Sequence, residues 1–201
     1  AKFPVILSGA GVVIGGAIEE CKKLAEKLDA PVCNGYQHND SFPGSHPLAV
    51  GPLGYNGSKA AMELISKADV VLALGTRLNP FSTLPGYGID YWPKNATIIQ
   101  VDMNPDRIGL TKKVTVGICG DAKQVAQQIL DKLSSDAGNS GRDERKNLIH
   151  KTKSAWLQTL AGLDHEAVSY THLRSNETIN HRVCRLLLEN GWWGGGGGGG
   201  G

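Results

Sequence analysis

Short apolar runs alternate with helical stretches from residue 5 to about residue 133 of the chain. Apolar, β-rich runs predict strands, and apolar residues at helical spacing predict helices between them. We expect strands at 5–7, 31–34, 69–74, 97–101 and 114–118, and helices at 17–28, 59–67 and 121–133. Strands alternating with crossover helices predict an α/β fold: a doubly wound, mostly parallel, Rossmann-like sheet of the type that binds NAD or FAD.

Two long irregular stretches interrupt this pattern, at 35–57 and 75–94. Both are rich in Gly, Pro and polar residues, and loops of such length usually serve binding or an interface. The packed domain is expected to end near residue 133. A polar linker follows at 134–145, and helical character resumes at about 143–160, in a helix with little to pack against on its own.

The last part of the chain, 167–201, loses all periodicity and ends in unbroken glycine from 194 to 201. Residues 168–188 resemble a translated sequencing-adapter read-through, and glycine alone cannot build a core. We expect 167–201 to be a disordered segment foreign to the natural protein; a flexible natural tail is the alternative. His172, His181 and Cys184 are therefore not taken as ligands.

Charge and cysteine content exclude several classes of protein. The net charge is +2, and Lys and Arg are scattered among Asp and Glu, so no basic stripe indicates nucleic-acid binding. Cys21, Cys33, Cys119 and Cys184 form no Cys-x-x-Cys pair, which argues against zinc and predicts buried thiols in a reducing cytoplasm. No apolar run reaches the roughly 20 residues of a membrane span.

A glycine-rich turn follows the first predicted strand, with glycines at 9, 11, 15 and 16. Glycines at this place let backbone amides approach a pyrophosphate at a helix N-terminus. The spacing departs from Gly-x-Gly-x-x-Gly, and Asn34 stands where a ribose-binding acid would be expected, which disfavours an NAD-dependent hydride transferase. A sirtuin-like deacylase is disfavoured by the lack of paired zinc cysteines, and His38 and His46 are given no catalytic role.

Taken in order, several segments resemble the central domain of the thiamine-diphosphate-dependent enzymes of the acetolactate synthase type. The resemblance runs from about residue 3 to residue 133 and is far more specific as a series than any one motif. The segments are 4–11 (PVILSGAG), 30–32 (APV), 46–48 (HPL), 51–57 (GPLGYNG), 68–77 (ADVVLALGTR), 99–102 (IQVD) and 120–122 (GDA).

Within this family, residues 36–40 and 79–93 are most similar to the sulfoacetaldehyde acetyltransferases, and 143–166 is similar to their connection to a third domain. The resemblance implies an acyltransferase of sulfonate metabolism, such as taurine degradation: a thiamine ylide adds to sulfoacetaldehyde, sulfite leaves, and phosphate takes the acetyl group. An acetolactate-synthase-like enzyme is the alternative.

The resemblance also implies where the cofactors and partners lie. Thiamine diphosphate and Mg²⁺ would be bound by N- and C-terminal domains outside this chain, in a homodimer or tetramer, and the chain alone would be inactive. Gly120-Asp121-Ala122 with Asn147 is close in spacing to the family's magnesium motif. Ala122 replaces its glycine, so Asp121 is predicted to cap a helix and no metal site is expected.

Some relatives bind FAD or ADP in this domain, and seven positions match those contacts: Gly9, Gly11, Gly54, Thr76, Arg77, Asp102 and Asp121. The alternative is structural: the glycines make a tight turn, Arg77 pairs with Asp102 or another carboxylate, and the domain is a scaffold. A stand-alone ADP- or FAD-binding module is the competing hypothesis from a different class.

Overall fold

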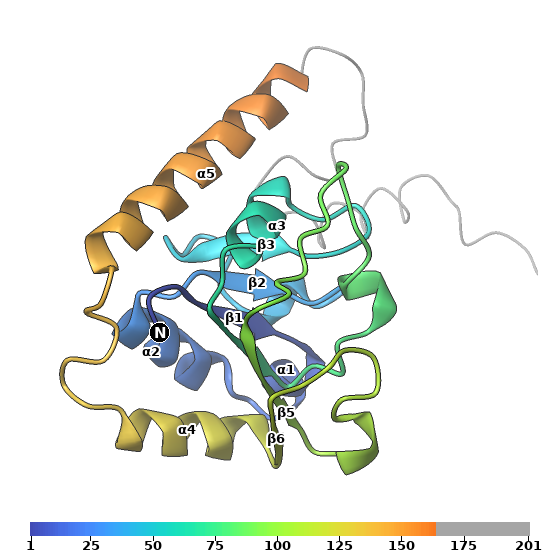
Figure 1. The fold of residues 1–201 in the computed structure, drawn as a ribbon, viewed down its shortest axis with the longest axis vertical. Coiled ribbons are helices and arrows are strands. Elements are labelled where there is room, and N and C mark those ends of the chain that lie inside the picture. Colours follow the sequence, from blue (N-terminus) through green and yellow to red (C-terminus); the bar gives the residue numbers. More distant parts are fainter. Residues whose placement is uncertain (164–201) are drawn as a thin grey trace, which may run out of the picture.

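The structure, a computed structural model, describes residues 1–163 and contains one six-stranded, fully parallel sheet (Figure 1). The strand order is β3-β2-β1-β4-β5-β6. The strands are β1 (Pro4–Ser8), β2 (Val32–Asn34), β3 (Ala49–Pro52), β4 (Val70–Leu74), β5 (Thr97–Asp102) and β6 (Val116–Cys119). This order is that of a doubly wound sheet, so the predicted fold class is confirmed.

Five α-helices accompany the described strands: α1 (Ala10–Ile14), α2 (Ile18–Leu28), α3 (Lys59–Ile65), α4 (Ala122–Lys132) and α5 (Arg142–Leu163). The chain proceeds outward from β1 to β3 and then returns to place β4 on the other side of β1. Because parallel crossovers are right-handed, this reversal puts α2 and α3 on opposite faces of the sheet. Accordingly α2 packs beside α4, and α3 packs beside α5 (Figure 1).

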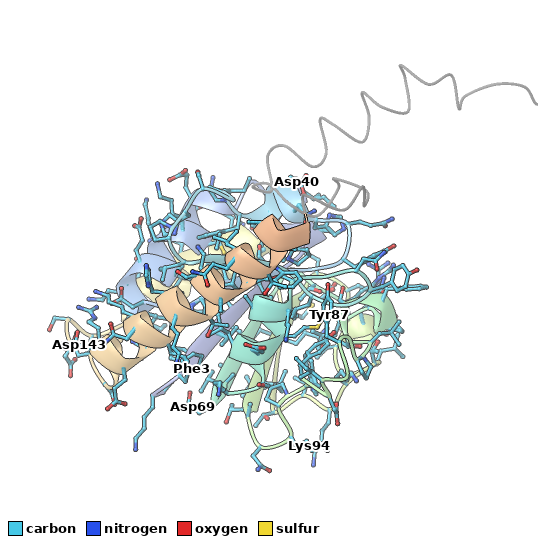
Figure 2. All side chains as sticks on the ribbon, turned by 90° about the horizontal axis from the view of Figure 1, so that it is seen from above. Phe3, Asp40, Asp69, Tyr87, Lys94 and Asp143 are labelled. Atoms are coloured by element: carbon cyan, nitrogen blue, oxygen red, sulfur yellow. The ribbon has the colours of Figure 1, made fainter. Side chains whose placement is uncertain are left out.

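The central strands β1 and β4 are apolar because both of their faces are covered. All five residues of β1 are buried, and β4 pairs with it in register from Pro4–Val70 to Ser8–Leu74. The carboxylate of Asp69 accepts hydrogen bonds from the backbone amides of Lys2 and Phe3, which fixes the start of β1 against β4 (Figure 2).

Two elements differ from the sequence-based expectation. The predicted loop 35–57 contains β3, an edge strand with Gly51 at φ +94° and Pro52 at its end. Pro and Gly are tolerated at a sheet edge, where one side needs no partner, and this composition hid the strand. The turn at Gly9–Gly11 is in fact the start of the short helix α1.

Helix α5 is better anchored than its sparse apolar residues indicated. Arg145 is 1% exposed, and its guanidinium donates five hydrogen bonds to backbone carbonyls. The acceptors lie in the first residues, at the end of α2 and in the linker: Lys2, Leu28, Asp29, Gly138 and Ser140. One side chain thus joins three segments, and Ile149 and Leu160 of α5 are also buried.

The cysteines of the described residues are free thiols; Cys21 and Cys33 are buried and Cys119 is exposed. Burial raises the pKa of Cys21 to about 12, against a weaker opposing effect of Ser8, and it also raises the pKa of Cys33. In residues 1–163 no helix has the length and apolar character needed to cross a membrane. The predicted boundaries at 133 and 166 stay predictions, and the segment 167–201 lies outside the described residues.

The Arg145 contacts can be tested against Arg142, a matched control three residues away on the same helix. Arg145→Met removes the donor of five part-buried hydrogen bonds and should lower the free energy of unfolding by about 3 kcal/mol. Arg142 forms a partly exposed ion pair with Asp29, so Arg142→Met should cost about 1 kcal/mol or less. Urea denaturation of both variants measures the difference; equal losses would contradict the anchoring role of Arg145.

Candidate functional site

A cleft of about 450 Å³ opens at the carboxyl ends of the strands. Its walls come from the turns that follow β1, β2, β4, β5 and β6, through residues such as Gly11, Gly35, Gly75, Asp102 and Gly120. It lies where the strand order reverses between β1 and β4. In open parallel sheets ligands bind at this switch point, because the two diverging crossovers leave a crevice there.

The floor of the cleft is formed by two glycine-containing segments in backbone contact: the start of α1 and the turn after β4. A Cβ on Gly11 would lie 2.7 Å from Gly75 Cα, and one on Gly9 would lie 2.5 Å from Thr76 Cβ. The amides of Gly9 and Gly11 donate to the carbonyls of Leu74 (3.1 Å) and Gly75 (2.8 Å). These two amides are therefore committed to the protein backbone and not directed at a ligand.

The cationic groups of the cleft are Arg77 and Arg107. Among residues 1–163, neither arginine has a carboxylate within the 4.0 Å of an ion pair, and Asp102 Oδ1 instead accepts from the amide of Asn104 at 2.9 Å. The expected pairing of Arg77 with Asp102 is therefore wrong. Asp102 caps its own turn, and both guanidinium groups are exposed and without an ion pair among residues 1–163.

A buried amide, Gln100, positions both sides of this cationic wall. Its Nε2 donates to the carbonyls of Thr76 (3.1 Å) and Arg107 (3.2 Å), and its Oε1 accepts from the amide of Gly109 (2.9 Å). Sequence reasoning missed Gln100 and Arg107. The signal was a Gln inside the otherwise apolar strand 97–101, where a buried amide needs partners from neighbouring loops.

Asp121 has the role of a helix cap. Its Oδ1 accepts from the amides of Lys123 and Gln124, each at 3.0 Å, as the sequence predicted. In residues 1–163 no group of three or more His, Cys, Asp or Glu side chains is placed to hold a metal ion. In Gly120-Asp121-Ala122, Oδ1 of Asp121 is thus engaged by the first amides of α4.

Five of the seven predicted cofactor contacts line the cleft: Gly11, Thr76, Arg77, Asp102 and Asp121. Gly9 packs beneath it against Thr76, and Gly54 lies elsewhere, where a Cβ would meet the carbonyl oxygen of Phe81 at 1.7 Å. His38 lines the cleft, whereas the ring of His46 packs on Phe42 and contacts Glu26. Two exposed apolar side chains that the sequence did not single out, Ile14 and Met103, also line it.

Comparison with known proteins found a family model and several relatives that match this chain. The profile described as "Thiamine pyrophosphate enzyme, central domain" matches residues 1–129. A Rhizobium meliloti protein described as a probable sulfoacetaldehyde acetyltransferase is 81% identical over 83% of this chain and 28% of its own length. A Methanocaldococcus jannaschii protein described as a probable acetolactate synthase large subunit is 38% identical over 80% of this chain and 24% of its own.

Among solved structures, a candidate thiamin diphosphate-dependent enzyme from Mycobacterium smegmatis matches with a TM-score of 0.54 and 26% identity. The match covers 67% of this chain and 25% of that one. The chain thus spans less than a third of the length of the proteins it resembles.

The packing role of Gly54 can be separated from backbone strain by comparison with Gly88. Both have positive φ, +86° and +72°, but a Cβ on Gly88 would meet open space. Gly88→Ala should lower the free energy of unfolding by about 1 kcal/mol, the cost of the left-handed region. Gly54→Ala adds a clash with the Phe81 carbonyl and should cost about 3 kcal/mol or more. Similar melting temperatures for the two variants would disprove the close contact.

Proposed function

We propose, from the premise that this chain belongs to the thiamine pyrophosphate enzyme family as its central domain, that the intact protein is a sulfoacetaldehyde acetyltransferase. The observation that carries the proposal is the 81% identity to the Rhizobium meliloti relative over 83% of the chain, compared with 38% for the acetolactate synthase relative. The family model matches residues 1–129, which include the whole cleft and both long loops. An acetolactate-synthase-like activity is therefore the weaker alternative.

The proposed reaction converts sulfoacetaldehyde and phosphate into acetyl phosphate and sulfite, and would serve sulfonate degradation, such as that of taurine, in the cytoplasm. Thiamine diphosphate, when bound with Mg²⁺, supplies the electron sink for such a reaction. Among residues 1–163 no cluster of three or more His, Cys, Asp or Glu side chains is placed to hold a metal ion. Both cofactors would be held by N- and C-terminal domains of the same polypeptide, in a homo-oligomer, and the central domain would serve as a scaffold.

The enzyme assignment is tested by placing residues 1–163 in the corresponding part of the 81% identical relative. We expect the chimera to release sulfite from sulfoacetaldehyde only when phosphate is added, and to form acetyl phosphate in equal amount. Pyruvate, the substrate expected of an acetolactate synthase, should give no acetolactate. A folded chimera that makes acetolactate but no sulfite would reverse the order of the two assignments.

A second function, retained binding of ADP or FAD in the cleft, is supported by the two unpaired arginines. Arg77 and Arg107 would hold the diphosphate through their guanidinium groups, because the amides of Gly9 and Gly11 already donate to the protein backbone. Ile14 and Met103, which are 85% and 71% exposed, supply apolar surface for a flat ring. The function requires a ligand in this chain itself and is independent of the acetyltransferase activity.

Calorimetry of the chain with ADP and with FAD tests this second function. If a nucleotide binds, Arg107→Met should weaken binding by about tenfold or more, since a charge-assisted hydrogen bond contributes roughly 1.5–3 kcal/mol. Lys112→Met is the control, because the Lys112 ammonium lies over the Trp92 ring and does not line the cleft. No heat with either nucleotide would end the hypothesis. Gly11→Val is a poor test, since its side chain would collide with Gly75 and disturb the fold.

A further inference from the structure

Aromatic and apolar side chains lie together on the two long loops beside the cleft; one of them, Tyr36, is half-buried and also lines the cleft. We call this group the aromatic ridge; its members are Tyr36, Tyr55, Phe81, Leu84 and Tyr87. Tyr55, Phe81, Leu84 and Tyr87 are 60%, 53%, 41% and 54% exposed. Large apolar side chains gathered on one surface typically mark a binding face, because water contact with them is unfavourable.

The loops that carry the ridge are unusual in charge. Residues 41–58 and 78–89 contain no Asp, Glu, Lys or Arg, in a chain in which 20% of residues are charged. A solvated loop of this length would normally carry several charges. Depletion of charge together with enrichment in Tyr and Phe is the composition of the core of a protein interface.

The ridge is held in place before any partner binds. The Tyr36 and Phe81 rings stack with centroids 5.6 Å apart, and the amide of Tyr55 donates to the Phe81 carbonyl at 3.0 Å. The Tyr87 hydroxyl donates to the carbonyl of Gly57 at 3.0 Å. Tyr87 itself has φ +54°, a strained conformation for a residue with a side chain. Such strain is kept where the surface must present a fixed shape.

The ridge is continuous with the helix through which the described chain continues. The Tyr87 ring meets the edge of the Trp156 ring of α5 at 5.5 Å between centroids. Figure 2 shows Tyr87 beside α3, the helix on which α5 packs. The next residue of α5, Leu157, is a further exposed apolar side chain on this helix, 54% exposed.

We propose that the aromatic ridge is the docking surface for the domain that follows α5 in the intact polypeptide. The inference rests on the proposed function, which supplies such a domain. The relatives are more than three times the length that this chain covers, so most of their polypeptide lies outside it. Trp156, which lies near the carboxyl end of α5, contacts Tyr87 of the ridge. Docking there would bury uncharged aromatic surface that is already rigid, at little cost in conformational entropy.

Hydroxyl-radical footprinting with peptide mass spectrometry tests burial without any substitution. The 201-residue chain is compared with the chimera that carries the remaining parts of the 81% identical relative. Oxidation of Tyr55, Phe81 and Tyr87 should fall by about fivefold or more in the chimera, as for the core of an interface. Leu110, which is 75% exposed and lies off the ridge, is the control and should change little. A fall of less than about twofold at all three ridge residues would overturn the proposal.

A photo-cross-link identifies the occupant. Phe81→p-benzoylphenylalanine in the chimera should join to peptides that follow α5, whereas Leu110→p-benzoylphenylalanine should not. Cross-links from Phe81 to the N-terminal domain, or to a second copy of this chain, would overturn the assignment. Protection of the ridge that rises with the concentration of the 201-residue chain alone would indicate a second copy as the occupant, and would also overturn the assignment.

Sulfite release by the same chimera keeps the two proposals separate. A protected ridge in a chimera that releases no sulfite would leave the docking surface in place and remove the enzyme assignment. An active chimera whose ridge stays fully oxidised would remove the docking proposal and leave the enzyme assignment in place.

Discussion

The structure depends on a backbone contact between the start of helix α1, which follows β1, and the glycine turn that follows β4. Gly11 and Gly75 approach so closely that a methyl group on either would meet backbone atoms of the other segment below 3 Å. This contact brings the ends of the two central strands together at the point where the strand order reverses. The cleft is the space left above it, so its shape follows from the absence of side chains at these positions.

The other parts of the molecule are arranged around that contact by buried polar groups. Gln100 ties the turn after β4 to the loop after β5, and thereby sets the relative positions of the turns that carry Arg77 and Arg107. Away from the cleft, the Arg145 side chain joins α5 to the residues that precede β1 and to the end of α2. The domain thus presents three features: a cleft lined by two arginines and two aspartates, an anchored helix and an uncharged aromatic ridge.

Apolar periodicity predicted five of the six strands and the helices that cover the sheet, because both faces of β1 and β4 are buried and their residues had to be apolar. The edge strand β3 was missed, since one exposed side freed it to contain Gly51 and Pro52. At the site, the helix cap of Asp121 followed from local spacing. Contacts between distant loops did not: Gln100 and Arg107 acquire their roles only through the fold, and Gly54 serves the packing of Phe81.

The central claim is that this chain supports a thiamine diphosphate enzyme but does not itself hold the reacting cofactor. A cryo-electron-microscopy map of an intact protein containing the chain, prepared with thiamine diphosphate and Mg²⁺, tests that claim most directly. The account predicts cofactor density outside residues 1–163, with the cleft at Arg77 and Arg107 free of thiamine diphosphate. Density for the diphosphate of the cofactor against those two arginines would contradict it.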